Sequence, residues 1–157
     1  MNRVSEARLH AINTSDGGVP KLARTSVAVR KTGLAGDRQR DLEHHGGPER
    51  AVSLYSLELI EALSGEGHPI AQGTIGENLT LAGLDWSSLR PGTRLEIGEV
   101  TIQLTADAPP CTNIEGSFKD GRFKRVAQKA HPGWARFYAR VLKEGTLRVG
   151  DAVRVIG

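Results

Sequence analysis

Cys111, the only cysteine among the 157 residues of the chain, lies in a sequence that presents a thiol rather than packs it. It follows Pro109 and Pro110, which lack the backbone N–H groups that a strand needs, at the end of a run that predicts a strand. A structural cysteine is usually found inside an apolar periodic segment instead. We therefore expect Cys111 to do chemistry, either by carrying sulfur or by ligating a soft metal.

A polar, glycine-bearing connection in the first third of the chain carries groups that bind anions. Arg38, His45 and Arg50 can donate to a phosphate or to an oxo group. Gly46 and Gly47 let the backbone approach a ligand closely. On these residues alone, a solvated surface loop explains the connection equally well.

A third constellation is Gly76-Glu77-Asn78, a carboxylate beside an amide after a glycine turn. Asn78 could recognise the edge of a heterocycle through its paired donor and acceptor. In isolation, the favoured interpretation is a tight turn that leads into a strand over 79–81. Two other carboxylates, Asp37 and Asp41, are expected to order their loop by accepting hydrogen bonds rather than to catalyse.

Other kinds of site find little support in the composition. The five histidines have no zinc-ligand spacing, and no serine lies in a nucleophile-elbow motif. The formal net charge of +3 comes from scattered charges, and aromatic residues make up 4% of the chain, so the excess favours a small anionic ligand over nucleic acid. A lone cysteine and the lack of a long apolar run indicate a soluble protein of the reducing cytosol, with no membrane partner.

The elements that must position these residues are mostly strands. The 19 glycines punctuate strand-like segments through the whole chain, which predicts one β-rich, barrel-like domain over residues 1–157. Leu57, Leu59, Ile60 and Leu63 recur at helical spacing after a Ser56 cap. We predict strands over 4–12, 25–29, 51–55 and 153–155, hairpins over 93–105 and 137–149, and a short polar helix over 122–129.

Taken together, the motifs resemble the MOSC domain, named for the C-terminal domain of molybdenum cofactor sulfurases. They occur in order along nearly the whole chain: Gly36-Asp37-Arg38-Gln39-Arg40-Asp41, His45-Gly46-Gly47, Ala51-Val52, Tyr55, Gly76-Glu77-Asn78-Leu79, Pro110-Cys111 and Gly150-Asp151. Each motif is weak alone, but this order is hard to produce by accident.

The resemblance implies a closed β-barrel similar to the pyruvate kinase insert barrel, with a few short helices. It also implies the molybdenum cofactor as ligand, with Cys111 at the metal or sulfur position. The pocket residues by this match are Arg38, His45, Gly46, Gly47, Glu77 and Asn78.

Two functions occur among MOSC proteins, and the resemblance leaves both open. In the sulfur carrier, our first expectation, Cys111 receives a persulfide from a desulfurase partner that holds pyridoxal phosphate. In the reductase of N-hydroxylated bases or amidoximes, Cys111 ligates molybdenum and a partner supplies electrons. The stretch 107–110 lacks the arginine often found ahead of the reductase cysteine, which disfavours that alternative. A non-catalytic barrel that binds a ligand or a partner is the third interpretation.

Overall fold

The structure, a computed structural model, describes residues 6–15, 19–37 and 47–156. Its strands are β1 (Arg8–Thr14), β2 (Leu22–Arg24), β3 (Ser26–Arg30), β4 (Gly33–Leu34), β5 (Val52–Ser56), β6 (Leu79–Ala82), β7 (Arg94–Ile97), β8 (Val100–Ala108), β9 (Arg136–Lys143), β10 (Gly145–Arg148) and β11 (Val153–Ile156). The helix α2 (Leu57–Gly65) is joined by 3₁₀ turns η1 (Pro48–Arg50), η2 (Trp86–Ser88), η3 (Thr112–Ser117), η4 (Lys119–Gly121) and η5 (Phe123–Val126). The mainly β architecture with short helices is confirmed.

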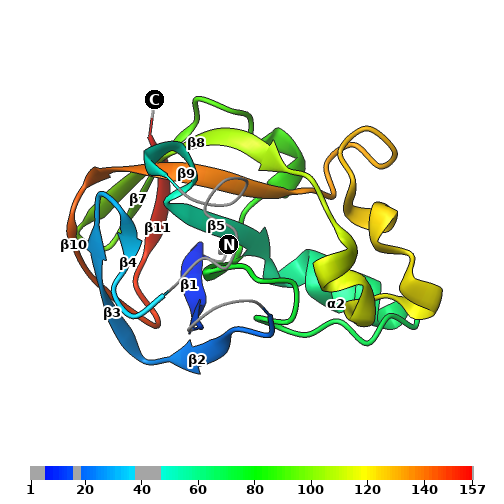
Figure 1. The fold of residues 1–157 in the computed structure, drawn as a ribbon. Coiled ribbons are helices and arrows are strands. Elements are labelled where there is room, and N and C mark those ends of the chain that lie inside the picture. Colours follow the sequence, from blue (N-terminus) through cyan, green and yellow to red (C-terminus); the bar gives the residue numbers. More distant parts are fainter. Residues whose placement is uncertain (1–5, 16–18, 38–46, 157) are drawn as a thin grey trace, which may run out of the picture.

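Two sheets make up the fold. The larger has eight strands in the order β11-β7-β8-β9-β5-β6-β1-β2, and the smaller has the order β10-β3-β4. Figure 1 shows β9 running across the molecule beside β8, with α2 and the 3₁₀ turns after β8 gathered at one end. The protein thus consists of two sheets, with the helix and most of the 3₁₀ turns at one end (Figure 1).

The closed barrel is not confirmed, because in the described ranges no sheet closes on itself. The eight-stranded sheet ends at β11 and β2. β1 and the residue before β11 share only the isolated bridge of Arg8 with Ala152. Backbone bonds around the Gly150-Asp151 turn, such as Leu9 N to Asp151 O at 2.8 Å, bring these segments together without a continuous ladder.

The core explains why the strands form where they do. Along β8, Val100, Ile102 and Leu104 are buried and alternate with partly exposed residues, as expected for a strand with one face on the core. The predicted hairpin is confirmed, since β7 pairs antiparallel with β8 and Ile97 lies opposite Val100.

The predicted helix is also confirmed. Ser56 adopts an extended backbone and its Oγ accepts the N–H of Leu59 at 3.2 Å, which caps α2. Ile60 and Leu63 face the core. The helix connects β5 to β6, and these two strands pair in parallel.

Three predicted elements differ from the structure. The first strand begins at Arg8 and continues to Thr14. The short polar helix predicted over 122–129 is confirmed only in part, because it is the 3₁₀ helix η5 over Phe123–Val126 and ends before Pro132 and Gly133. The closing hairpin over 137–149 is wrong: β9 pairs with β8 and β5, whereas β10 crosses to β3 in the other sheet.

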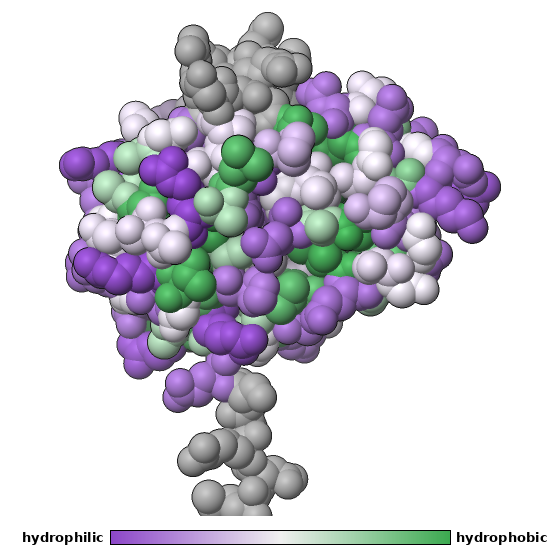
Figure 2. Space-filling model, turned by 90° about the horizontal axis from the view of Figure 1, so that it is seen from below, coloured by the Kyte–Doolittle hydropathy of each residue, from purple (hydrophilic) through white to green (hydrophobic). Residues whose placement is uncertain are grey.

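The surface offers small, separated apolar areas. Figure 2 shows one face on which hydrophobic groups alternate with hydrophilic ones. The large apolar side chains exposed on the described part of the chain are Val19, Leu22, Leu142, Val149 and Val155. No helix of the described ranges is long and apolar enough to cross a membrane.

Candidate functional site

Cys111 lies half-buried between the end of β8 and the first residue of η3, with an extended backbone (φ −141°, ψ 176°). β8 ends at Ala108, so the two prolines carry the chain out of the sheet as the sequence predicts. The carbonyl of Cys111 accepts the N–H of Ile114 at 3.1 Å and so starts η3. The thiol is therefore presented on an ordered loop.

A cation from β9 contacts this loop. Arg136 is buried, and it stands opposite Ala108 in the β8–β9 register. Its Nη2 donates to the carbonyl of Pro109 at 3.1 Å, and its Nη1 donates to the carbonyl of Ile75 at 2.9 Å. One guanidinium thus ties the segment before Cys111 to the segment before Gly76-Glu77-Asn78.

Arg136 also interacts electrostatically with the groups around it. Burial lowers its pKa, and the charges of Tyr138, Glu77 and Cys111 act in the opposite direction. An arginine remains protonated in spite of such a shift. A fixed positive charge therefore lies within electrostatic reach of the Cys111 sulfur.

Further along β9, alternate residues bind the segment that follows Gly47. Arg136, Tyr138 and Arg140 lie on one face because side chains alternate along a strand. The guanidinium of Arg50 lies 5.3 Å from the centre of the Tyr138 ring. Arg140 Nη2 donates to the Glu49 carboxylate at 2.6 Å. The turn η1 is thereby docked on the face that carries Arg136.

The hydroxyl of Tyr138 is close enough to Arg136, Arg50 and Cys111 to feel the charge of each. Burial raises the pKa of its hydroxyl, while the charges of Arg136 and Arg50 lower that pKa and the charge of Cys111 raises it. Three segments far apart in the sequence thus meet on one face of β9: the turn after Gly47, the residues before Glu77, and the proline loop of Cys111.

Gly47 is exposed and has the left-handed backbone (φ 90°) that favours glycine. A Cβ at this position would meet nothing within 4 Å, so open space surrounds the backbone there. This fits the expected close approach of a ligand. Arg38, His45 and Gly46 lie outside the described residues.

Asn78 is fully buried and acts as a junction between strands. Its Oδ1 accepts the N–H of Ser53 at 3.0 Å, and its Nδ2 donates to the Asn13 carbonyl at 3.3 Å and to Asp37 Oδ2 at 2.9 Å. These bonds use both ends of the amide. The expected contact of Asn78 with a pterin stays a prediction, whereas its hydrogen bond to Asp37 positions Asp37.

Asp37 behaves as the expected loop-ordering acceptor. Its side chain is 4% exposed, and Lys21 Nζ contacts its two oxygens at 2.7 and 2.8 Å. Its Oδ1 also accepts the N–H of Ser15 at 2.9 Å. A buried carboxylate with this many donors is held in place rather than offered as a base. Asp41 lies outside the described residues.

Glu77 is fully buried beside Asn78. Its Oε2 accepts the N–H of Gly73 at 3.0 Å and the hydroxyl of Thr80 at 3.1 Å. Burial raises the pKa of Glu77 to about 7. Its Oε1 and the Oδ1 of Asn13 are buried and have no hydrogen-bond partner in the described part of the chain, so a proton on Glu77 would supply a donor that this cluster otherwise lacks. The cofactor contact expected of Glu77 stays a prediction.

Comparison with known proteins identifies a family over the part of the chain that carries these residues. The model of the MOSC domain matches residues 41–154, which include Cys111 and Arg136. The chain belongs to the MOSC domain family. It is 33% identical to the protein YflK of Bacillus subtilis (strain 168) over 144 residues, which are 89% of this chain and 63% of YflK. It is 29% identical to the protein YiiM of Escherichia coli (strain K12) over 113 residues, 69% of this chain and 50% of YiiM.

This MOSC chain thus spans less than two thirds of the length of these two relatives. Among solved structures, YiiM from Geobacillus stearothermophilus matches with a TM-score of 0.75 and 23% identity, over 96% of this chain and 75% of that one. The YuaD protein from Bacillus subtilis matches with a TM-score of 0.74 and 17% identity, over 96% of both chains. These likenesses show a shared fold.

Sequence reasoning missed Arg136 and Tyr138. Arg136 stands in the run Trp134-Ala135-Arg136-Phe137-Tyr138, where a single charge among apolar residues was the available signal. Such a charge is buried only when partners from other segments accept its hydrogen bonds, and the local sequence does not name those partners.

Proposed function

We propose that this MOSC protein binds the molybdenum cofactor and that Cys111 is the thiolate that meets the metal or carries sulfur to it. One observation carries the proposal: Arg136 joins the Cys111 loop to the residues before Glu77, on the β9 face that also holds η1. Segments from three of the family motifs therefore lie near one thiol and two cations.

The donor set fits a metal that arrives within an organic cofactor. In the described ranges no group of three or more histidine, cysteine, aspartate or glutamate side chains could hold a bare metal ion. A soft metal that already has sulfur ligands from a dithiolene needs only one thiolate from the protein. Arg50, beside Gly47, can receive the phosphate of the pterin, and Arg136 can hold the charge near the sulfur.

As a sulfur carrier, Cys111 would take sulfur from a cysteine desulfurase partner. That partner, with its pyridoxal phosphate, converts free cysteine to alanine and leaves the sulfur on Cys111 as a persulfide, so no oxidant is required. The half-buried position of Cys111 at the end of an ordered loop suits such a transfer. A reducing cytosol would keep the accepting thiol available.

A molybdenum-dependent reductase is the second candidate, and one observation favours it. The sequence lacks an arginine shortly before Cys111, but the fold supplies Arg136 from β9 to the carbonyl of Pro109. The missing cation that disfavours the reductase is therefore replaced from another strand. Electrons for the N-hydroxylated substrate would come from a reductase partner.

The test measures molybdenum and sulfur on the same sample. The protein is purified from a cofactor-producing host, and molybdenum is measured by mass spectrometry beside the intact mass of the polypeptide. Near-stoichiometric molybdenum that is lost in Cys111→Ser supports the reductase, and a mass increase of one sulfur atom on Cys111 without metal supports the carrier. Neither molybdenum nor bound sulfur, with a thiol inert to iodoacetamide, would overturn the proposal in favour of a non-catalytic binding domain.

A further inference from the structure

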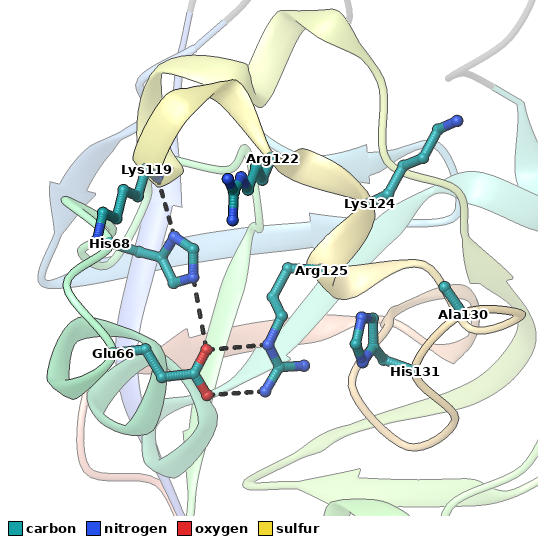
Figure 3. Close-up of a pocket in the computed structure, with 8 residues that line it drawn as sticks. All are labelled: Glu66, His68, Lys119, Arg122, Lys124, Arg125, Ala130 and His131. Carbon is teal, nitrogen blue, oxygen red and sulfur yellow. Dashed lines mark hydrogen bonds and ion pairs between the residues drawn. The ribbon is translucent and has the colours of Figure 1, made fainter.

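A hollow of about 460 Å³ lies at the helical end of the molecule, between the end of α2 and the turns η4 and η5. Figure 3 shows the eight residues that line it: Glu66, His68, Lys119, Arg122, Lys124, Arg125, Ala130 and His131. Neither Cys111 nor Arg136 is among them. Its size falls in the range of small-molecule pockets.

The charge of this hollow is strongly one-sided. Four of its lining residues are lysine or arginine and two are histidine, against one carboxylate. That carboxylate, Glu66, is already engaged, because Arg125 Nε and Nη2 donate to its two oxygens at 3.0 and 2.8 Å. Asp120 lies 3.8 Å from Arg122 in a largely exposed pair, which solvent screens. The hollow therefore keeps an excess of positive charge.

Arg125 contributes a buried donor that has no partner. Its guanidinium lies 4.0 Å from the centre of the Trp134 ring, which holds it in one orientation. Two of its nitrogens bind Glu66, while Nη1 is buried without a hydrogen-bond partner among the described residues. The charge of Arg125 is therefore only partly compensated, and an anion bound in the hollow would lower its electrostatic cost.

The two histidines add no hydrogen-bond acceptor that would offset the excess of cationic donors in the hollow. Nδ1 of His68 accepts the N–H of Lys119 at 2.9 Å, so the proton of the neutral ring is on Nε2, which faces Glu66 at 3.5 Å. In Figure 3, Arg125 lies between Glu66 and the ring of His131, and Arg122 lies on the side of His68 and Lys119. Lys124 points away from the others, so its contribution is a long-range charge.

We propose that this hollow is a second binding site, separate from the Cys111 site, for a small molecule with a phosphate or similar oxyanion group. The anion would accept from the exposed side chains of Arg122 and Lys119, and the charge of Arg125 would add to the attraction. Since the space is a hollow lined mainly by cationic side chains, it suits a compact anion better than a flat acidic protein surface.

The experiment uses inorganic pyrophosphate as the probe and isothermal titration calorimetry on the whole chain. Saturable binding at one site per chain is expected. Lys119→Gln combined with Arg122→Gln should weaken binding by about tenfold or more, equivalent to about 1.4 kcal/mol. Both side chains are exposed, so the variant should keep the melting temperature of the parent chain.

The matched control is Lys143→Gln combined with Arg154→Gln, which removes the same charge from exposed positions on β9 and β11. This control and Cys111→Ser should bind pyrophosphate as tightly as the parent. Equal weakening in both double variants, or no saturable binding by the parent, would overturn the proposal. Saturation by a polyglutamate peptide and not by pyrophosphate would also overturn it, in favour of an acidic protein partner.

Discussion

Arg136 donates to the carbonyl of Pro109 over 3.1 Å, and this bond fixes the residue that stands two positions before Cys111. The other terminal nitrogen of the same guanidinium donates to the carbonyl of Ile75. A planar guanidinium can bind two carbonyls in fixed directions, which an ammonium cannot reproduce. The position of the thiol therefore depends on the shape of Arg136 as well as on its charge.

Replacing Arg136 by lysine separates shape from charge. Arg136→Lys keeps the cation but leaves at least one carbonyl without its charged donor, so we expect a loss of about 1.5–3 kcal/mol in the free energy of unfolding. Urea denaturation measures it. Arg140→Lys, on the same face of β9 but 41% exposed, should cost about 1 kcal/mol or less. Equal losses in the two variants would contradict the role given to Arg136.

Arg136→Lys should also lower the amount of molybdenum or persulfide sulfur that the purified protein carries, because the Cys111 loop loses its anchor. Arg154→Lys, at an exposed position on β11, serves as the control and should load like the parent. Unchanged loading in Arg136→Lys would mean that charge alone is sufficient.

The Lys21 and Asp37 pair should be far more sensitive than a surface pair. Both side chains are almost fully buried, so Lys21→Met leaves a buried carboxylate without its cation and should cost about 3–5 kcal/mol. Arg154→Met breaks the exposed pair with Glu96 and should cost about 1 kcal/mol or less. Chemical denaturation of both variants at neutral pH makes the comparison. A small effect of Lys21→Met would show that the hydrogen bonds from Asn78 and from the Ser15 amide are enough to stabilise the buried Asp37 carboxylate.

Glu77 should make stability fall as the pH rises. Its pKa is about 7 in the folded protein against an ordinary value of 4.5, so the folded state holds a proton that the unfolded chain releases between these values. The resulting stabilisation is complete below pH 4.5 and is lost as the pH rises through about 7.

Glu77→Gln removes this titration while keeping an acceptor for Gly73 and Thr80. Between about pH 5 and about pH 8, the parent should lose about 1–3 kcal/mol more than the variant. Thermal or urea unfolding at several pH values measures the difference. Parallel curves for the two proteins would show that Glu77 is ionised in the fold at all of these pH values.

Two glycines with similar backbone angles should respond differently to alanine. Gly73 (φ 80°) and Gly47 (φ 90°) both have a left-handed backbone, so alanine at either position costs about 1–2 kcal/mol of stability. A Cβ on Gly73 would also collide with the carbonyl of Lys21, whereas one on Gly47 meets nothing within 4 Å. Gly73→Ala should therefore lower the melting temperature markedly more than Gly47→Ala. Similar melting temperatures would show that the backbone near Lys21 moves to make room for the added methyl group.

What the sequence could predict is the part that local chemistry decides. The helix α2 follows from the spacing of its apolar residues and from the Ser56 cap, and the β7–β8 hairpin follows from alternation around Gly98. Cys111 could be identified because two prolines mark its exit from the strand. These features involve neighbours within a few positions.

The remaining features depend on pairs that are distant in the sequence. The burial of Arg136 depends on the carbonyls of Ile75 and Pro109, and the strand β10 finds its partner in β3 rather than in β9. The side chain of Asn78 has the donor and acceptor groups of a ligand-binding residue, yet Ser53, Asn13 and Asp37 occupy them. Hydrogen-bonding capacity is visible in a sequence, but its partner is not.

The crossing of β10 to β3 has a consequence for biosynthesis. Val29 stands opposite Gly145 and Val27 opposite Leu147, with most of the chain between them. On the ribosome, β3 leaves the exit tunnel early, and the edge that pairs with β10 has no partner until the last part of the chain is translated. During that interval its apolar residues are open to other chains, so this strand is where we expect nascent molecules to aggregate first.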